Sequence, residues 1–302
     1  MADTIPVIVN ASAGNGSTAG WVENLEQKFA AAGLLAKLHL MQHGSDITPA
    51  VEAALKAGAR LVVAGGGDGT VSAVAASLVG SGAALGVLPM GTLNHFAKDL
   101  GIPLVQEQAI AVLATGGRLD VDVGEVNGRI FINNSSLGLY PDIVRDREQR
   151  RRRLGHGKWR ALLAASVTAA RRYPVLRVEI EVDGQHLVRR TPFVFIGNNQ
   201  YTMEGFEIGE RVALDRGELS LYLTHRMGRF GLLQLAFMAL LRRLDQARDF
   251  DVLTAREFVV TTGHRRLRVA TDGEVTVMET PLHYRLRPAA LRVVVPAREP
   301  AQ

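Results

Sequence analysis

A glycine-rich segment with a single acidic residue is the sharpest candidate for chemistry in this sequence. The apolar residues 61–64 run directly into Gly65, Gly66, Gly67, Asp68, Gly69 and Thr70. Glycines have no Cβ, so a ligand can approach their backbone closely. The helix expected to start near Thr70 turns its free N–H groups and the positive end of its dipole toward the same place. The segment is therefore predicted to bind phosphate groups.

Asp68 narrows the kind of phosphate site that this segment can form. A carboxylate beside phosphates repels them unless it binds a divalent cation or handles a proton. The segment has neither the Gly-Lys-Ser/Thr of a Walker A loop nor the Gly-x-Gly-x-x-Gly of a dinucleotide-binding loop. The alternative is a plain glycine-rich turn in which Asp68 caps the following helix. Three glycines between an expected strand and an expected helix favour phosphate binding over that alternative.

Two further segments, residues 10–16 and 88–94, also follow an expected strand and precede an expected helix. Loops at successive strand ends can face one crevice, which is where open sheets covered by helices bind ligands. The candidate binding residues in the two segments are Asn10, Ser12, Gly91, Thr92 and Asn94. Each segment alone is also compatible with an ordinary connection between a strand and a helix.

These segments must be positioned by the surrounding strands and helices. The pattern of these expected elements predicts an α/β domain followed by a β-rich domain. In residues 1–123, short apolar runs alternate with segments of helical periodicity, which is the pattern of a parallel sheet covered on both faces. In residues 124–302, short runs bounded by turn signals predict antiparallel strands, with helices near 159–172 and 230–244. A terminal strand near 291–295 can belong to either domain.

Composition excludes several classes of protein. The 302 residues are 47% apolar and 22% charged, which is typical of a globular chain and not of a disordered one. There is no cysteine, so disulfide scaffolds, thiolate metal sites and cysteine nucleophiles are excluded. No signal peptide or membrane span is expected, and the protein is interpreted as cytoplasmic. The net charge of +5 favours anionic partners.

Taken together, these segments resemble the diacylglycerol kinase catalytic domain family, which includes bacterial lipid kinases and sphingosine kinases. The resemblance spans nearly the whole chain and is carried by residues 7–16 (VIVNASAGNG), 65–70 (GGGDGT), 88–97 (LPMGTLNHFA), 133–138 (NNSSLG), 214–219 (LDRGEL) and 271–274 (TDGE). NAD kinases and phosphofructokinases share the glycine-rich segment. The segment around Gly91 and the late Asp272-Gly273-Glu274 make a lipid kinase the better fit.

The resemblance implies a two-domain kinase that transfers the γ-phosphoryl group of ATP to a lipid hydroxyl, with catalysis in a cleft between the domains. The glycine-rich segment would hold the ATP phosphates, with help from Thr92 and Asn94. Asp68 would bind the catalytic Mg²⁺ or assist the hydroxyl, and Glu274 would be the general base. From spacing alone, residues 272–274 are a tight hairpin turn with a solvated Glu, and only the resemblance gives Glu274 this role.

Three positions depart from the family pattern. His95 stands where the family often has Asp, so any role for an acid there is lost. The family tends to carry an acidic pair, associated with a structural Mg²⁺ in its bacterial members, where this chain has Asp215 followed by Arg216. A guanidinium cannot ligate a cation, so a second metal at Asp215 is not expected, and Arg216 is predicted to lie near Asp215 or a neighbouring carboxylate. Ala11 replaces the usual Pro after Asn10, which loosens that turn.

A basic run is the remaining distinctive feature. It contains Arg145, Arg147, Arg150, Arg151, Arg152, Arg153, Lys158 and Arg160, with Trp159 among them. Such runs are commonly solvated loops. For a lipid kinase, the run is equally compatible with docking on an anionic membrane surface, where each Lys or Arg adds about 1 kcal/mol and Trp lies at headgroup depth. No motif that binds nucleic acid accompanies the charges, so nucleic acid is not an expected partner.

Two other functions stay open at this level. A kinase of the NAD kinase type shares the glycine-rich segment and would act on a soluble substrate. A non-catalytic nucleotide- or lipid-binding protein of the same fold would account for His95 and Arg216. The sequence carries no signal for the oligomeric state.

Overall fold

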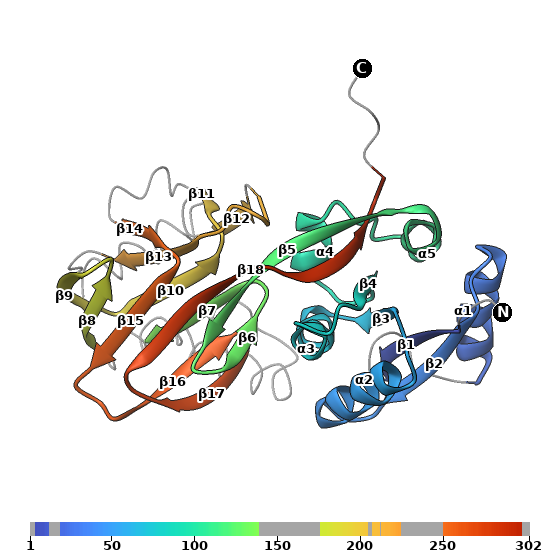
Figure 1. The fold of residues 1–302 in the computed structure, drawn as a ribbon, viewed down its shortest axis with the longest axis horizontal. Helices are drawn as coiled ribbons and strands as arrows, with labels where there is room; N and C mark the ends of the chain where they lie inside the picture. The colour runs from blue at the N-terminus through green and yellow to red at the C-terminus, as the bar shows by residue number, and fades with distance from the viewer. Residues whose placement is uncertain are drawn as a thin grey trace, which may run out of the picture. The chain divides into compact units, whose positions relative to one another are not determined.

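The computed structural model describes residues 4–11, 19–138, 176–204, 207–211, 213–224 and 250–297. The chain forms two compact units, a first unit of residues 1–123 and 287–302 and a second unit of residues 124–286. Figure 1 labels their elements from the blue N-terminus to the red C-terminus. Ser12, the basic run and the helices predicted near 159–172 and 230–244 lie outside the described residues.

The first unit contains a parallel sheet with helices between its strands. Its strands pair in the order β2-β1-β3-β4, and each neighbouring pair is parallel, as the sequence predicted. The elements are β1 (Ile5–Asn10), α1 (Ala19–Ala31), β2 (Ala36–Met41), η1 (Gly44–Asp46), α2 (Ile47–Lys56), β3 (Leu61–Gly66), α3 (Asp68–Leu78), β4 (Ala84–Pro89), α4 (His95–Asp99) and α5 (Gln106–Thr115).

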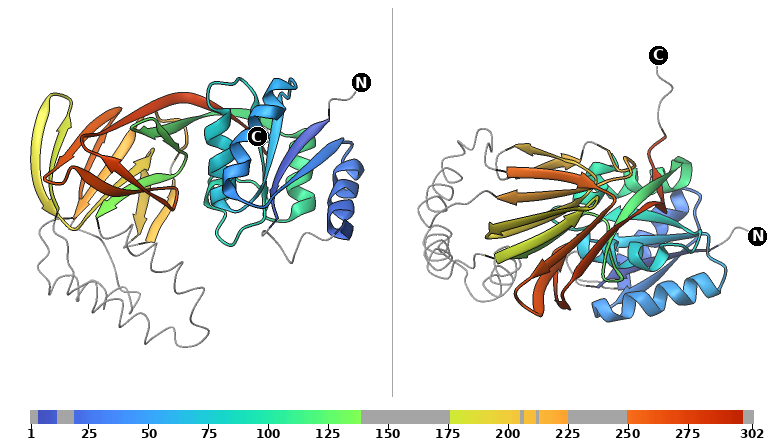
Figure 2. Two further views of the ribbon diagram at one scale, coloured as in Figure 1. Left: turned by 90° about the horizontal axis from the view of Figure 1, so that it is seen from below. Right: turned by 60° about the vertical axis from the view of Figure 1, so that its left-hand side comes forward.

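Burial on both faces explains why β1, β3 and β4 are largely continuous apolar runs. Val7, Val63 and Leu85 are among the strand residues that are fully buried. α1 contacts α5, whereas α2 contacts α3, and the helices lie on both sides of the sheet (Figure 2). A strand that is covered on both faces has no solvent side on which polar residues would alternate. The apolar runs of β1, β3 and β4 therefore follow from their position between two layers of helices.

The second unit is a β-sandwich, which confirms the predicted antiparallel β-rich domain. One sheet has six strands in the order β14-β13-β10-β7-β16-β17. The facing sheet contains β9, β8, β15 and the first part of β18, also antiparallel. Side chains of both sheets, such as Ile180 and Tyr284 from one and Ile196 and Val269 from the other, form one buried core.

The strands of this unit are short and follow one another closely. They are β5 (Gly117–Val126), which begins in the first unit, β6 (Arg129–Phe131), β7 (Asn134–Gly138), β8 (Leu176–Val182), β9 (Gln185–Thr191), β10 (Phe193–Asn198), β11 (Tyr201–Glu204), β12 (Glu207–Arg211), β13 (Leu219–Thr224), β14 (Phe250–Ala255), β15 (Glu257–Thr262), β16 (Arg266–Thr271), β17 (Glu274–Glu279) and β18 (Leu282–Val295). β11 and β12 form a separate two-stranded ribbon.

Tight turns of one kind connect three of the hairpins. In each turn Asn or Asp precedes Gly, and all the turn residues have a positive φ, between 46° and 86°: Asn127, Gly128, Asp183, Gly184, Asp272 and Gly273. A two-residue type I′ turn needs a positive φ at both positions, which these residue types tolerate. The hairpins predicted at residues 127–128 and 272–273 are thereby confirmed.

β18 is shared by the two units. Its first residues pair antiparallel with β15, whereas Arg292 and Val293 pair parallel with β4. Between these stretches the N–H of Ala289 donates to Asp122 Oδ1 at 2.9 Å. The terminal strand that the sequence left unassigned thus joins the sheet of the first unit. Among the helices in the described part of the chain, none combines the length and apolarity needed to cross a membrane.

Candidate active site

The glycine-rich segment forms the junction between β3 and α3. β3 ends at Gly66 and α3 begins at Asp68, so Gly67 alone joins them, with an extended backbone (φ −87°, ψ −177°). The helix therefore starts earlier than the predicted position near Thr70. The reason is that Gly66 stays in the sheet, where its carbonyl accepts the N–H of Met90 at 2.9 Å. Asp68 is thus half-buried in the first turn of a helix.

Two glycines of this region have no room for a side chain. A Cβ on Gly66 would lie 2.6 Å from Oγ1 of the buried Thr70. A Cβ on Gly91 would lie 2.5 Å from Cα of Gly67. The β3–α3 junction and the segment after β4 therefore meet backbone to backbone at Gly67 and Gly91, and this approach requires glycine at position 91. Two of the strand-end segments identified from the sequence are brought together in this way.

Asn94 shapes the segment after β4. Its backbone is left-handed (φ 51°, ψ 46°), a conformation that Asn tolerates better than most residues. Its Oδ1 accepts the N–H of Gly91 at 2.9 Å, and its Nδ2 donates to the carbonyl of Gly91, also at 2.9 Å. The buried amide therefore closes the turn that carries Gly91, while Thr92 is exposed. Contact of either side chain with a nucleotide stays a prediction.

The junction lies at the edge of the sheet where ligands bind in folds of this kind. The chain goes from β1 to β2 on one side and returns to β3 on the other side, so the strand order reverses between β1 and β3. Open α/β sheets bind ligands outside the carboxyl ends of the strands at this reversal. Asn10 ends β1 there, beside the paired residues Val9 and Gly65. The N–H groups of the first turn of α3 complete a setting that suits phosphate.

Asp68 fits a Mg²⁺ ion that arrives with a nucleotide. Such an ion keeps several waters and needs only one or two protein carboxylates besides the phosphates. Asp68 supplies one carboxylate beside the glycine backbone. Within the described ranges, no group of three His, Asp or Glu residues could form an all-protein metal site. The residues present therefore fit a nucleotide-borne cation.

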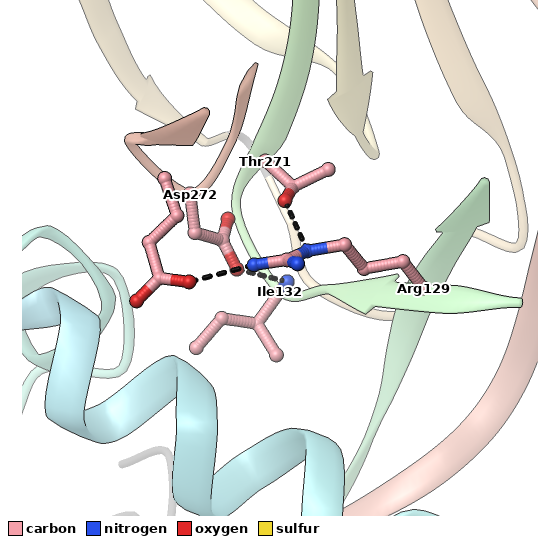
Figure 3. A network of polar contacts seen from close by, with 5 residues as sticks. Arg129, Ile132, Thr271 and Asp272 are labelled. Atoms are coloured by element: carbon pink, nitrogen blue, oxygen red, sulfur yellow. Dashed lines mark hydrogen bonds and ion pairs between the residues drawn. The ribbon is translucent and has the colours of Figure 1, made fainter. Parts of the chain in front are cut away.

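The second candidate centre is the β16–β17 hairpin in the second unit. The carboxylate of Asp272, in the turn, accepts the N–H of Ile132 at 2.8 Å (Figure 3). It also accepts the N–H of Asn133 at 2.8 Å and of Asn134 at 3.1 Å. Asp272 therefore fastens the turn to the connection between β6 and β7. Glu274 follows as the first residue of β17, with a side chain that is 62% exposed.

Arg129 forms an ion pair with Glu274, and no pattern in the sequence indicates this contact. Arg129 Nη2 lies 2.6 Å from Glu274 Oε2. Arg129 Nε donates to Thr271 Oγ1 at 2.8 Å (Figure 3). Glu274 is thus an ion-paired carboxylate and not the freely solvated Glu expected from spacing alone. Arg129 comes directly after the turn at residues 127–128, where an exposed basic residue is ordinary.

Arg211 is a second arginine whose contacts the sequence did not reveal. It is 7% exposed, and its Nη1 donates to the carbonyl of Ile132 at 2.6 Å and its Nη2 to Asn133 Oδ1 at 3.0 Å. Tyr201 donates its hydroxyl to the carbonyl of Asn133 at 2.9 Å. The connection between β6 and β7 is therefore held by Asp272 on its N–H side and by Arg211 on its carbonyl side.

The loop that carries Asp215 gives no support for a second metal. Both Asp215 and Arg216 are exposed. Arg216 Nη1 donates to Gln200 Oε1 at 3.3 Å, and the N–H of Arg216 donates to Asn199 Oδ1 at 3.0 Å. Among the described residues, the guanidinium therefore bonds to an amide oxygen and not to the carboxylate that we predicted, because the bond to Asn199 places Arg216 beside Gln200. That no second metal binds at Asp215 stays a prediction.

Comparison with known families agrees with this two-unit organisation. Residues 4–126 match the diacylglycerol kinase catalytic domain. Residues 142–295 match the YegS C-terminal NAD kinase beta sandwich-like domain. The chain therefore belongs to the diacylglycerol kinase family, within its YegS-like branch, which confirms the resemblance drawn from the motifs.

Individual relatives cover most of the chain. A protein of Pseudomonas fluorescens named "Probable lipid kinase YegS-like" is 28% identical over 275 residues, 89% of this chain and 89% of the relative. A diacylglycerol kinase of Bacillus subtilis is 28% identical over 277 residues, 89% of this chain and 88% of the relative. A crystal structure of a diacylglycerol kinase from Bacillus anthracis superposes with a TM-score of 0.68 at 20% identity, covering 97% of this chain and 96% of that one. At that identity the superposition establishes the fold.

Proposed function

We propose that this protein is an ATP-dependent lipid kinase that transfers the γ-phosphoryl group of ATP to a lipid hydroxyl. The observation that carries the proposal is the close approach of Gly67 and Gly91, which exposes bare backbone next to Asp68 at the strand-order reversal. This geometry supports phosphate binding, and the domain that contains it matches the diacylglycerol kinase catalytic domain. Diacylglycerol-like lipids are the acceptors that membership of the family favours.

In this proposal the first unit binds ATP. The phosphates lie against the backbone at the start of α3 and against the segment after β4, which places Gly65, Gly66, Gly67, Gly69, Thr70 and Gly91 in the site, with Asn10, Thr92 and Asn94 at its margin. Asp68 holds Mg²⁺, which neutralises phosphate charge when it is bound. Asp68 also keeps metal-free phosphates out, because like charges repel.

The second unit supplies the group that takes the proton. Glu274 Oε2 is held by Arg129, whereas Glu274 Oε1 makes no hydrogen bond or ion pair with the described residues. Oε1 is therefore available to accept the proton of a lipid hydroxyl as its oxygen attacks the γ-phosphorus. Phosphoryl transfer depends mainly on positioning and charge, so one well-placed carboxylate is sufficient protein chemistry on the acceptor side.

A soluble-substrate kinase of the NAD kinase type is the second candidate. The specific observation that favours it is the match of residues 142–295 to a domain described as NAD kinase beta sandwich-like. The same sandwich could therefore present a pocket for a dinucleotide instead of a lipid. The match of residues 4–126 to the diacylglycerol kinase catalytic domain favours the lipid.

An acceptor panel tests the proposal. The full chain is incubated with labelled ATP, Mg²⁺ and one of four acceptors: diacylglycerol, sphingosine, phosphatidylglycerol or NAD. We expect a labelled lipid, with diacylglycerol as the best acceptor. If NAD alone is labelled, the protein is a soluble-substrate kinase and not a lipid kinase. Binding of Mg-ATP without transfer to any acceptor would indicate a non-catalytic member of the family.

Contact with a membrane is part of the proposal, because a diacylglycerol substrate stays in the bilayer. We propose that the basic run at residues 145–160 brings the enzyme to the anionic cytoplasmic face of a membrane. The panel therefore presents diacylglycerol in neutral vesicles and in vesicles with anionic lipid. Higher turnover on the anionic vesicles, reduced by salt, is expected. Equal turnover on neutral and anionic vesicles would indicate that the basic run is a solvated loop with no role in membrane binding.

Replacing Gly91 with Ala is expected to weaken ATP binding and stability together. The added Cβ would meet the Cα of Gly67 at 2.5 Å, so one backbone must move. Overpacking of this kind costs about 1–3 kcal/mol of unfolding free energy. The same movement separates the two phosphate-binding segments, and we expect an affinity for Mg-ATP that is lower by about tenfold, or about 1.4 kcal/mol. Urea unfolding and titration calorimetry measure the two effects.

Gly20→Ala is the matched control for this change. Gly20 lies in α1, where an added Cβ meets nothing within 4 Å. Ala favours a helix over Gly by about 1 kcal/mol at most, so this variant should be as stable as the wild type or slightly more stable. Wild-type affinity and stability in Gly91→Ala would contradict the close approach of the two segments.

A further inference from the structure

We propose that Arg129 is a positioning residue for Glu274: its guanidinium holds one carboxylate oxygen so that the other meets the acceptor hydroxyl. The inference rests on the proposed function, because it takes Glu274 as the general base. Arg129 acts through Glu274 and does not itself touch the acceptor.

One guanidinium joins both strands of the β16–β17 hairpin. Arg129 Nε donates to Thr271 Oγ1 at 2.8 Å, and Arg129 Nη2 lies 2.6 Å from Glu274 Oε2. Thr271 and Glu274 face each other in register on either side of the two-residue turn, so Arg129 bridges the base of that turn. Thr271 is only 2% exposed, which fixes one end of the bridge in the protein interior.

The backbones that carry Arg129 and Glu274 are also fixed relative to each other. Asp272, two residues before Glu274, accepts the N–H of Ile132, three residues after Arg129, at 2.8 Å. Arg129 itself pairs with Val126 in the β5–β6 hairpin. Both side chains therefore start from hairpins that are hydrogen-bonded to each other. A contact between such side chains can define where a carboxylate oxygen lies.

The other end of the same hairpin shows what an ordinary surface ion pair looks like. Arg266 Nη2 lies 3.1 Å from Glu279 Oε1, and the two side chains are 69% and 55% exposed. Isolated exposed pairs contribute little, because they are screened and must order long side chains. The side chain of Arg129 is 36% exposed, and it has the buried Thr271 as a second partner. Arg266 is therefore a matched control for Arg129.

Removing Arg129 should affect the rate of transfer and not the binding of ATP. A general base must lie within hydrogen-bond reach of the proton that it takes. Glu274 has no other partner in the described part of the chain that would hold its carboxylate in place. A reacting group that is misplaced by about 1 Å can lower the rate about 100-fold. The effect should therefore appear in kcat, with an unchanged KM for ATP.

The test compares Arg129→Gln, Arg129→Lys and Arg266→Gln in the full chain, with labelled ATP and the acceptor identified by the panel. Arg129→Gln is expected to lower kcat by about 10- to 100-fold and to change the KM for ATP by less than about twofold. Arg129→Lys keeps the positive charge but lacks the planar guanidinium that bonds to two partners at once. Its kcat should therefore lie between those of Arg129→Gln and the wild type. Arg266→Gln should match the wild type. A Lys variant as slow as the Gln variant would overturn the proposal.

A double variant separates positioning from direct action on the substrate. If Arg129 acts only through Glu274, adding Arg129→Gln to Glu274→Gln lowers kcat no further than Glu274→Gln alone. A further tenfold loss would show that Arg129 acts on the substrate or nucleotide itself, and would overturn the proposal. If Arg129→Gln does not fold, Thr271→Val, which removes only the anchor of the guanidinium, replaces it, and an unchanged kcat would overturn the proposal.

The outcomes also separate this inference from the proposed function. Normal turnover in Arg129→Gln together with loss of turnover in Glu274→Gln overturns only the role of Arg129. Normal turnover in Glu274→Gln would show that Glu274 is not the general base. This result would overturn the inference about Arg129 but not the proposed kinase activity. A wild-type chain that phosphorylates none of the four acceptors overturns the proposed function, and the inference with it.

Discussion

Replacing Glu274 with Gln is expected to lower kcat for transfer to the lipid by about 10²- to 10⁴-fold, the range that a positioned general base contributes. Gln has the same length as Glu, and its amide oxygen can still accept a hydrogen bond from Arg129. It cannot take up a proton, so the acceptor hydroxyl loses its base. The KM for ATP should stay within about twofold, because the proposed phosphate site uses other residues.

Stability should hardly change in this variant. The Glu274 side chain is 62% exposed, and exposed ion pairs contribute less than about 1 kcal/mol. Glu279→Gln provides the control, since Glu279 ends the same strand and pairs with Arg266 at 3.1 Å. Glu279→Gln should retain full turnover. Equal losses in both variants would mean that the hairpin is disturbed generally and that Glu274 has no special role.

Local patterns in the sequence were sufficient to predict most of the fold. The periodicity of residues 1–123 predicted a parallel sheet, because strands covered on both faces leave a continuous apolar run. Asn127-Gly128 and Asp272-Gly273 predicted hairpins, because these pairs adopt a positive φ easily. Both kinds of signal lie within a few neighbouring residues, and that is why they can be recognised without knowledge of distant contacts.

The details of the proposed phosphate site depend on distant contacts and were not predicted. Gly66 was expected in a loop but stays in the sheet, because β4 supplies a hydrogen-bond donor from Met90. Gly91 could be seen as a turn residue, but its close approach to Gly67 arises only when β3 and β4 pair. The two hydrogen bonds between the Asn94 amide and Gly91 were likewise not predicted from the sequence.

The hydrogen-bond partners of Arg129 and Arg211 were also not predicted from the sequence, because they lie far away along the chain. Arg129 contacts Thr271 and Glu274 across sequence separations of 142 and 145 residues. Arg211 donates to Ile132 across 79 residues. A basic residue beside a turn or at the end of a strand is ordinary, so nothing local distinguishes these side chains from solvated ones. Motif matching found Glu274, but only the folded chain supplies the groups that hold it.

Replacing Asp68 with Asn is expected to lower phosphoryl transfer by about 10³-fold, because the nucleotide-borne Mg²⁺ loses its protein carboxylate. Folding should be affected much less. Asp68 lies in the first turn of α3, where loss of a negative charge costs about 0.3–1 kcal/mol. Asp46→Asn is the control, since Asp46 precedes α2 and is likewise a carboxylate at the start of a helix. It should leave turnover unchanged.

Binding measured with and without the metal distinguishes the two roles that Asp68 can have. If Asp68 binds the cation, Asp68→Asn weakens the affinity for Mg-ATP, yet it keeps or improves the affinity for ATP in the presence of a chelator, because a negative charge beside the phosphates is gone. If Asp68 only stabilises the start of α3, the two affinities change alike and follow the loss of stability. Opposite changes in the two affinities can come only from a carboxylate that stands next to the phosphates.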